Sequence, residues 1–256
     1  MYKKELVPGV VVYRPKFKLD EVLHQIKNDE LIKSRYEKWG AHARYYQGDV
    51  SFMKSDDDKV GQTDALKEIE RVYKKVFYEY LKDNKNSGIL PPFIKYSGKG
   101  KSWAPLAGGL LQIHGKKQDD QDSNLGLGFH LDIATNDRSP GWKHIFTIIF
   151  YLNDNYDDGE ICFTYGNSFN DINFPNKDTK VLKYKPKAGD LVAFPAHYPH
   201  AAYKAYKEDR YVFLSTCSYK TEEGQDMSAY LPEDPSILLK IRIEGCESLY
   251  INGADI

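Results

Sequence analysis

Apolar residues between positions 63 and 84 recur at intervals of three and four, namely Leu66, Ile69, Val72, Tyr73, Val76, Phe77, Tyr80 and Leu81. This spacing places apolar side chains along one face of a helix. The pattern therefore predicts an amphipathic helix over residues 63–84. A shorter helix is predicted from Asp20 to about Ile32, with Val22, Leu23 and Ile26 facing inward.

From residue 105 onward the pattern changes. Short runs rich in Ile, Val, Phe and Tyr are separated by Gly, Asn, Asp and Pro, which is typical of strands joined by turns. The predicted strands are 108–114, 128–133, 144–152, 160–164, 180–184, 190–195 and 210–218. Because seven or eight antiparallel strands make a jelly roll, we expect an α+β fold with a double-stranded β-helix (jelly-roll) core and supporting N-terminal helices.

The chain length of 256 residues fits one large domain or two small ones, and all-β barrels of this size commonly stay single. We predict one domain over 1–256, with a helical support region at 1–104, a jelly-roll core at 105–220 and a C-terminal extension at 221–256. Residues 238–244 alternate apolar and charged side chains, which predicts a further edge strand.

Charge and cysteine content restrict the environment. With 36 basic and 37 acidic residues the protein has no net field to attract nucleic acid or an anionic membrane. No apolar run approaches the ~20 residues of a membrane span, and the first residues lack the apolar core of a signal peptide. Cys162, Cys217 and Cys246 are widely spaced, which argues against a disulfide framework. We expect a cytoplasmic protein.

The triplet His130-Leu131-Asp132 carries the first chemical signal. In an extended strand alternate side chains point to the same face, so His130 and Asp132 would project toward one centre. His200 follows the predicted strand 190–195 and is the best-placed third ligand. Two imidazoles and one carboxylate with open positions form the ligand set of a non-haem Fe(II) site, whereas a structural zinc site is closed by four ligands.

Arg210 lies ten residues after His200, at the start of the predicted strand 210–218. A hairpin would bring it back beside the metal. A guanidinium there can make a bidentate, charge-assisted pair with the far carboxylate of a dicarboxylic co-substrate such as 2-oxoglutarate. Taken alone, Arg210 would be interpreted as part of a surface ion pair. Its position ten residues after His200 in the sequence favours a role in binding the co-substrate.

The ordered series resembles the Fe(II)/2-oxoglutarate-dependent dioxygenase superfamily, and within it the prolyl-4-hydroxylase-like branch. The resemblance covers about residues 105–220 and rests on His130-Leu131-Asp132, Thr147–Asp154, Asp158–Phe163, Pro186–Pro195, His200 and Arg210. The family spacing also favours His200 over His197, which follows the same predicted strand. His197 is then expected to be a loop residue near the entrance.

The resemblance implies that His130, Asp132 and His200 hold Fe(II) and that Arg210 binds 2-oxoglutarate. It further implies that O2 is consumed, that succinate and CO2 are released, and that ascorbate is a candidate reductant. Family members often carry a co-substrate-contacting Tyr on the strand before the His-x-Asp triplet, which this chain lacks. Gln112 or His114 is the candidate replacement, and Thr147 is also expected to contact the co-substrate.

The expected reaction is hydroxylation of an unactivated C–H bond in a prolyl or peptidyl group or a free amino acid. Asp132 argues against the halogenases of the superfamily, which have a small residue there. Thr216 stands where the nucleic-acid demethylases have a second Arg, so a nucleic-acid substrate is not expected. The alternative is a non-catalytic jelly-roll protein that binds a metal such as Zn(II) or Ni(II). Nothing in the sequence indicates an oligomeric state.

Overall fold

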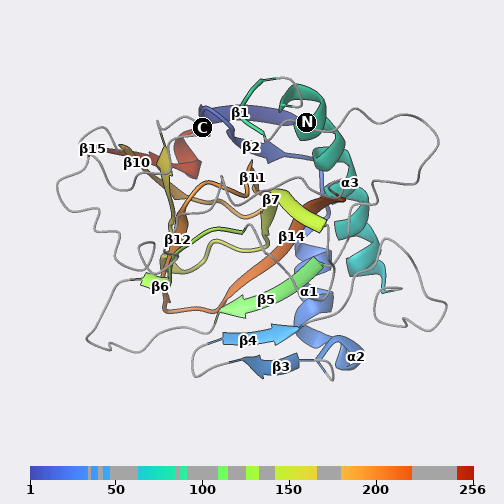
Figure 1. Cartoon of the computed structure of the whole chain (residues 1–256). Helices are drawn as coiled ribbons and strands as arrows, with labels where there is room; N and C mark the ends of the chain where they lie inside the picture. The colour runs from blue at the N-terminus through green and yellow to red at the C-terminus, as the bar shows by residue number, and fades with distance from the viewer. Residues whose placement is uncertain are drawn as a thin grey trace, which may run out of the picture.

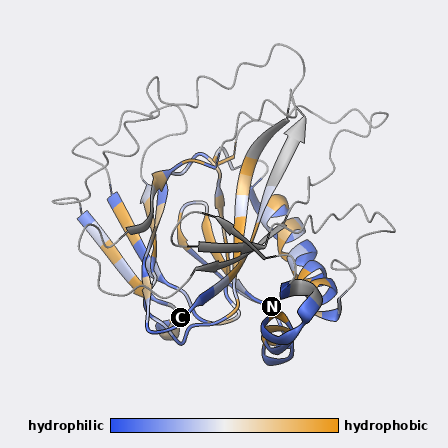
Figure 2. Cartoon of the chain, turned by 90° about the horizontal axis from the view of Figure 1, so that it is seen from below, coloured by the Kyte–Doolittle hydropathy of each residue, from blue (hydrophilic) through white to orange (hydrophobic). Residues whose placement is uncertain are grey.

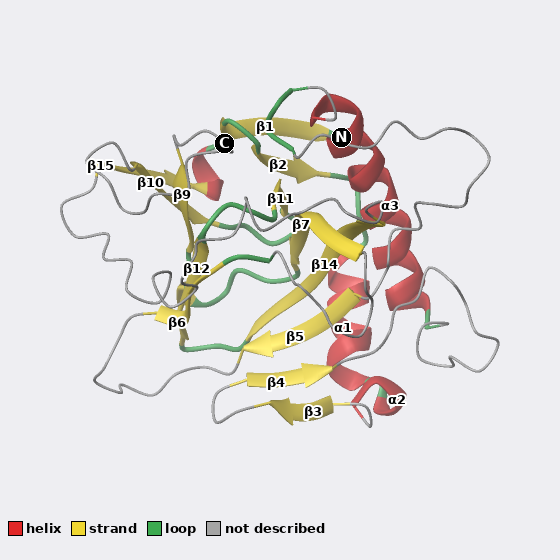
Figure 3. Cartoon of the chain, in the orientation of Figure 1, coloured by secondary structure: helices red, strands yellow, loops and turns green. Residues whose placement is uncertain are grey.

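A computed structural model describes ten stretches of the chain, and all structural statements below concern these residues. They are 1–33, 36–39, 43–46, 63–84, 87–90, 109–114, 125–132, 142–165, 180–220 and 247–256. Two β-sheets face each other, and helices cover the outer face of one of them (Figure 1 and Figure 3). The predicted α+β fold with a jelly-roll core is confirmed.

The larger sheet has eight strands in the order β1-β2-β11-β7-β14-β5-β4-β3. Its strands are β1 (Tyr2–Val7), β2 (Val10–Arg14), β3 (Tyr36–Trp39), β4 (Ala43–Tyr46), β5 (Gly109–His114), β7 (Trp142–Tyr151), β11 (Leu191–Pro195) and β14 (Arg210–Lys220). All neighbours in this sheet pair antiparallel. We call it the major sheet.

The minor sheet has five strands in the order β15-β10-β9-β12-β6. Its strands are β6 (Leu125–His130), β9 (Ile161–Tyr165), β10 (Lys180–Lys185), β12 (His200–Tyr203) and β15 (Glu247–Asn252), which is followed by a 3-10 helix at Gly253–Asp255. The strand β15 pairs parallel with β10, whereas the other pairs are antiparallel. A short ribbon of β8 (Asp157–Asp158) and β13 (Ala205–Tyr206) lies outside both sheets.

The helices are α1 (Leu19–Asn28), α2 (Glu30–Lys33) and α3 (Asp64–Asn84). The predicted helix over 63–84 is confirmed as α3, and its apolar stripe is buried. The predicted second helix divides into α1 and the short α2, which are separated at Asp29, a residue with extended backbone angles. Among the described helices none is long and apolar enough to span a membrane.

The central strands of the major sheet are buried on both faces, because helices cover one face and the minor sheet covers the other. On β7, Phe146, Ile148 and Phe150 pack toward α1 and α3, whereas Ile149 and Tyr151 face the minor sheet. Such strands are near-continuous apolar runs instead of alternating ones. Figure 2 shows hydrophobic residues along the strands through the middle of the molecule and a mixture of both kinds along the helices.

One part of the sequence prediction was incomplete. The region 1–104, predicted to be helical, also contributes the strands β1 to β4. In β2, Val10 and Val12 enter the barrel interior while Val11 and Tyr13 pack against the helices. Because both faces are apolar, β2 lacks the alternating pattern that identifies a half-buried strand.

The seven predicted strands are confirmed as β5, β6, β7, β9, β10, β11 and β14. The bounds of β6 differ most, since it ends at His130 and not at residue 133. Antiparallel pairing of His130 with His200 brings Leu131 opposite Pro199, and proline has no N–H to continue the ladder. The predicted edge strand at 238–244 lies outside the described residues.

Candidate metal centre and arginine cluster

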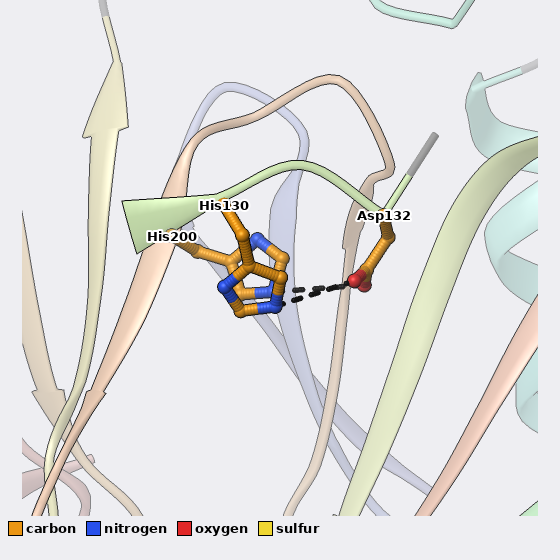
Figure 4. A group of neighbouring side chains, drawn as sticks. All are labelled: His130, Asp132 and His200. Carbon is orange, nitrogen blue, oxygen red and sulfur yellow. Dashed lines mark ion pairs between the residues drawn. The ribbon is translucent and has the colours of Figure 1, made fainter. Parts of the chain in front are cut away.

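His130, Asp132 and His200 come together at one point of the barrel, and their ligand atoms all lie within 4.8 Å of one another. The Nε2 atom of His130 is 3.5 Å from Asp132 Oδ1, and the Nε2 atom of His200 is 3.6 Å from Asp132 Oδ2. Figure 4 shows both imidazoles turned toward the carboxylate. With Thr147, described below, we call these residues the metal cluster.

The minor sheet positions both histidines. His130 is the last residue of β6 and His200 the first of β12, and the two are direct cross-strand partners. Each Nδ1 lies close to a backbone carbonyl two residues earlier, at 2.9 Å from Gly128 O and 3.0 Å from Tyr198 O. A carbonyl only accepts, so the hydrogen sits on Nδ1 and the Nε2 lone pair of each ring is free for a metal.

Asp132 is held differently, because it lies two residues beyond the end of β6. Its backbone N–H donates to Ala196 O at 3.0 Å, just after β11. The Thr147 hydroxyl on β7 donates to Asp132 Oδ2 at 2.6 Å. The carboxylate is therefore attached to the major sheet, while the histidines belong to the minor sheet. The metal cluster joins the two sheets.

Burial and charge prepare these groups for a cation. Burial alone would raise the pKa of Asp132, but electrostatic interaction with the neighbouring His200 and His130 and the hydrogen bond from Thr147 bring the pKa well below its ordinary value. Burial lowers the pKa of His200 to about 4, so its imidazole is neutral at pH 7. A carboxylate and a neutral imidazole are the protonation states in which these side chains bind metals.

The His200 ring is fixed by packing and its side chain is 4% exposed. Its centroid lies 4.7 Å from that of Phe194, in an edge-to-face arrangement, and 4.2 Å from that of His130. His197, the competing candidate, is not part of the described cluster of ligand atoms. Its side chain is half-buried, and burial lowers its pKa to about 3.

Arg210 begins β14 and is 3% exposed. Its Nη1 donates to two carbonyl oxygens, Gly159 O at 3.0 Å and Tyr203 O at 3.2 Å. Its Nε is buried and has no hydrogen-bond partner among the described residues. No carboxylate of the described chain forms an ion pair with it.

The charge of Arg210 affects the pKa of two buried tyrosines. Burial raises the pKa of both Tyr151 and Tyr156, and the guanidinium opposes this effect without reversing it. Both phenols therefore keep their protons and can donate a hydrogen bond. The Tyr156 hydroxyl is buried and has no partner in the described part of the chain. Together with Arg210 and Gly159 these residues form what we call the arginine cluster.

Gly159 shapes this cluster through its backbone. Its φ is +73°, a left-handed conformation that glycine adopts readily, and an added Cβ would lie 2.6 Å from Cε2 of Tyr156. The absence of a side chain thus allows the Tyr156 ring to pack on the carbonyl-bearing residue that Arg210 contacts.

The remaining predicted site residues are placed less fully. The strand β5 puts His114 opposite Arg210 and Gln112 opposite Val212 in the ladder with β14. The side chains of Gln112 and His114 lie outside what the structure describes, so their binding role stays a prediction. Sequence reasoning missed Tyr151 and Tyr156. The sequence contained an indication of Tyr151, because residues 147, 149 and 151 alternate along the predicted strand and therefore lie on the same face of it.

The two clusters lie within the same jelly roll. Tyr203, whose carbonyl binds Arg210, is three residues along β12 from His200, which corresponds to about 10 Å of extended strand. The described site thus combines three side chains that could hold a cation with a buried guanidinium from β14, which donates to the carbonyl of the last residue of β12. This arrangement is of the kind that holds a metal together with a short dicarboxylate.

Comparison with known proteins agrees with this class of site. Residues 121–215, which include His130, Asp132, His200 and Arg210, match the family model described as the 2OG-Fe(II) oxygenase superfamily. The sequence resemblance to Fe(II)/2-oxoglutarate oxygenases thus extends over this segment, which holds all four residues of the candidate site. No match was found among curated proteins.

The following solved structures are similar to this chain at low sequence identity. A prolyl-4-hydroxylase from Pseudomonas putida has a TM-score of 0.50 at 12% identity, covering 84% of this chain and 93% of that one. The non-heme alpha ketoglutarate dependent epimerase SnoN from nogalamycin biosynthesis has a TM-score of 0.52 at 15% identity, covering 89% and 87%. A Trichoplax adhaerens prolyl hydroxylase, solved with a hypoxia inducible factor peptide fragment, has a TM-score of 0.49 at 18% identity, covering 84% of each chain.

Proposed function

We propose that this protein hydroxylates an unactivated C–H bond of a prolyl or other amino-acid group in a peptide, a protein or a free amino acid. Fe(II), 2-oxoglutarate and O2 would be required, and succinate and CO2 would be released. The observation that carries the proposal is the combination of a His-Asp-His cluster with a buried arginine that has no acidic partner among the described residues.

The donor set fits Fe(II). Two imidazoles and one carboxylate leave open positions for exogenous ligands, and this combination is typical of non-haem Fe(II) oxygenases. When bound, the iron would supply the oxygen activation that no side chain can perform. His130 and His200 would hold it through Nε2, and Asp132 through a carboxylate oxygen.

Arg210 fits the distal carboxylate of 2-oxoglutarate. A buried charge is costly unless a partner compensates it, and a guanidinium pairs well with a carboxylate. Two carbonyls orient one nitrogen of Arg210, while its Nε hydrogen is left for a ligand. The Tyr156 hydroxyl, also buried without a described partner, would donate to the same carboxylate. Tyr151 would support the anion from its place in the barrel interior.

The substrate class follows from the resemblance to the prolyl-4-hydroxylase-like branch. The near-neutral charge and Thr216, in place of a second arginine, count against nucleic acid. The rival, a metal-binding jelly roll without turnover, explains the metal cluster but gives the buried Arg210 no role. A residue that is costly to bury and unpaired among described residues favours the enzyme.

Product analysis tests the proposal. The full-length protein is incubated with Fe(II), 2-oxoglutarate, O2 and ascorbate, and either proline-containing peptides or free amino acids. Succinate is quantified, and mass spectrometry looks for a gain of one oxygen in the substrate. We expect succinate in all mixtures and oxygen gain in the peptide or amino-acid set. Absence of succinate from iron-loaded protein would refute the oxygenase reaction.

Ascorbate is varied in the same assay. If it acts as a reductant for this protein, its omission lowers the number of turnovers before the rate declines, without changing the initial rate. An initial rate that depends on ascorbate concentration would contradict this role.

A further inference from the structure

Strand pairing does not fix the position of Asp132, the carboxylate of the metal cluster. The ladder between β6 and β12 ends at His130 and His200, and Asp132 lies two residues further on. His130 and His200 are each fixed by their strand and by a carbonyl at Nδ1. For Asp132 the corresponding restraints are its N–H bond to Ala196 O and the side-chain bond from Thr147.

Thr147 is an unusual residue for its place. It lies on β7 among Phe146, Ile148 and Ile149 and is 0% exposed. A hydroxyl buried in an apolar strand is unfavourable without a hydrogen-bond partner. Its partner is Oδ2 of Asp132, at 2.6 Å. This distance is typical of a hydroxyl donating to an ionised carboxylate, which is a stronger bond than one between neutral groups.

The bond has a direction that matters for the metal. Asp132 Oδ2 accepts the Thr147 hydrogen, while Oδ1 faces His130 Nε2 at 3.5 Å. The hydroxyl uses part of the hydrogen-bonding capacity of Oδ2 and fixes the rotation of the carboxylate. Oδ1 is then the oxygen that is free of a described hydrogen bond. A carboxylate so held binds a metal through one oxygen and leaves more positions open for other ligands.

We propose that Thr147 is the positioning residue of the metal centre. Its hydroxyl orients the Asp132 carboxylate so that Oδ1 binds the metal as a single ligand, and it connects the carboxylate to the major sheet. This inference rests on the metal site of the proposed function but not on 2-oxoglutarate or on turnover. It also gives Thr147 a role distinct from the co-substrate contact predicted from the sequence.

The test uses Co(II), whose visible bands report coordination number and geometry, added to the full-length apoprotein without 2-oxoglutarate. Affinity is measured by titration for the wild type, Thr147→Val, Thr147→Ser and Thr164→Val. Valine keeps the shape and removes the hydroxyl, whereas serine keeps the hydroxyl. Thr164 is the matched control, because it is buried in β9 and its hydroxyl lies 3.5 Å from Pro199 O and not on a ligand.

We expect Thr147→Val to weaken Co(II) binding by about 10- to 100-fold, as is common when a group supporting a metal ligand is lost, and to change the visible bands. Thr147→Ser and Thr164→Val should keep the wild-type affinity and spectrum. Unchanged binding in Thr147→Val would overturn the inference. So would equal weakening in Thr164→Val, or a serine variant as weak as the valine variant.

If Thr147→Val does not fold, Thr147→Ala replaces it and must show the same weakening relative to Thr147→Ser. Thermal unfolding of each apoprotein shows whether a variant is folded. A wild type that binds Co(II) but shows no reaction with Fe(II) and 2-oxoglutarate would refute the proposed function and leave the Thr147 inference standing. A wild type that binds no Co(II) would overturn both.

Discussion

The metal cluster and the arginine cluster differ in how far the protein itself satisfies them. In the metal cluster every side chain has a described hydrogen bond, from Thr147 to Asp132 and from each histidine to a carbonyl. In the arginine cluster a buried guanidinium lacks an acidic partner, and its Nε and the Tyr156 hydroxyl lack any partner within the described chain.

In the proposed function, the protein alone organises the first site, whereas a ligand completes the second. Unsatisfied buried polar groups reduce stability unless something binds them. Arg14 shows the contrast within the same protein, because its guanidinium pairs with the buried carboxylate of Asp190 at 2.5 Å. Arg14 is paired within the fold, whereas Arg210 has no acidic partner among the described residues and is proposed to bind an anion. Each prediction below changes one side of this comparison.

The largest effect is expected from His200→Ala. Removal of one of three ligands should abolish iron retention and with it all turnover, while the fold persists because the barrel core is unchanged. Metal content after gel filtration measures this. His197→Ala is the control, since His197 is a nearby half-buried histidine outside the metal cluster. Iron retained at the wild-type level in His200→Ala would remove this residue from the ligand set.

Arg210→Met should weaken 2-oxoglutarate binding by about 10- to 100-fold, because a hydrogen bond to a charged group contributes about 1.5–3 kcal/mol. Iron binding should be unaffected, since the arginine does not contact the metal cluster. Isothermal titration with 2-oxoglutarate on the metal-loaded protein measures the change. Arg14→Met should instead lower the melting temperature and leave 2-oxoglutarate binding unchanged. Equal loss of 2-oxoglutarate binding in both variants would contradict the proposed difference between Arg14 and Arg210.

Gly159→Ala should reduce the free energy of unfolding by about 1–3 kcal/mol, because a side chain in a left-handed conformation is strained. The new Cβ would also displace the Tyr156 ring, so co-substrate affinity should fall. Chemical denaturation and titration measure the two effects. Gly88→Ala is matched in backbone, with φ +76°, but has no atom within 4 Å of its added Cβ. It should lose stability and keep its co-substrate affinity.

Tyr156→Phe should have the smallest effect, a loss of about 2- to 10-fold in 2-oxoglutarate affinity, as expected for a hydrogen bond that contributes about 0.5–1.5 kcal/mol. The KM for 2-oxoglutarate should rise while kcat stays close to the wild type. Tyr13→Phe is the control, because the Tyr13 hydroxyl is also buried without a described partner but packs on the helix side of β2. An unchanged KM in Tyr156→Phe would place its hydroxyl outside the co-substrate site.

The sequence predicted most of the jelly roll because its strands are bounded by clear turn residues. The helix α3 was equally clear, since it is amphipathic over its length. The strands β1 and β2 were missed for a physical reason. Alternation of polar and apolar residues identifies a strand with one face exposed to solvent. The strand β2 is covered on both faces by elements distant in the chain. Only the three-dimensional arrangement reveals its pairing with β11.

For the site, the sequence indicated which side chains would meet but not how each is supported. His130, Asp132 and His200 were identifiable by residue type and order, and the structure brings them together. The bond from Thr147 to Asp132 joins a residue of β7 to one that lies 15 positions earlier, beyond the end of β6, so no local pattern could reveal it. The same holds for Tyr156, whose relation to Arg210 depends on the turn at Gly159.

The most direct test of the two-cluster account is an anaerobic absorption spectrum of the apoprotein after addition of Fe(II) and then 2-oxoglutarate, repeated with Asp132→Ala and Arg210→Ala. We predict a visible charge-transfer band that requires both additions, is lost in Asp132→Ala and needs much more 2-oxoglutarate in Arg210→Ala. Iron bound without any band in the wild type would contradict the account, because the arginine cluster would then not serve 2-oxoglutarate.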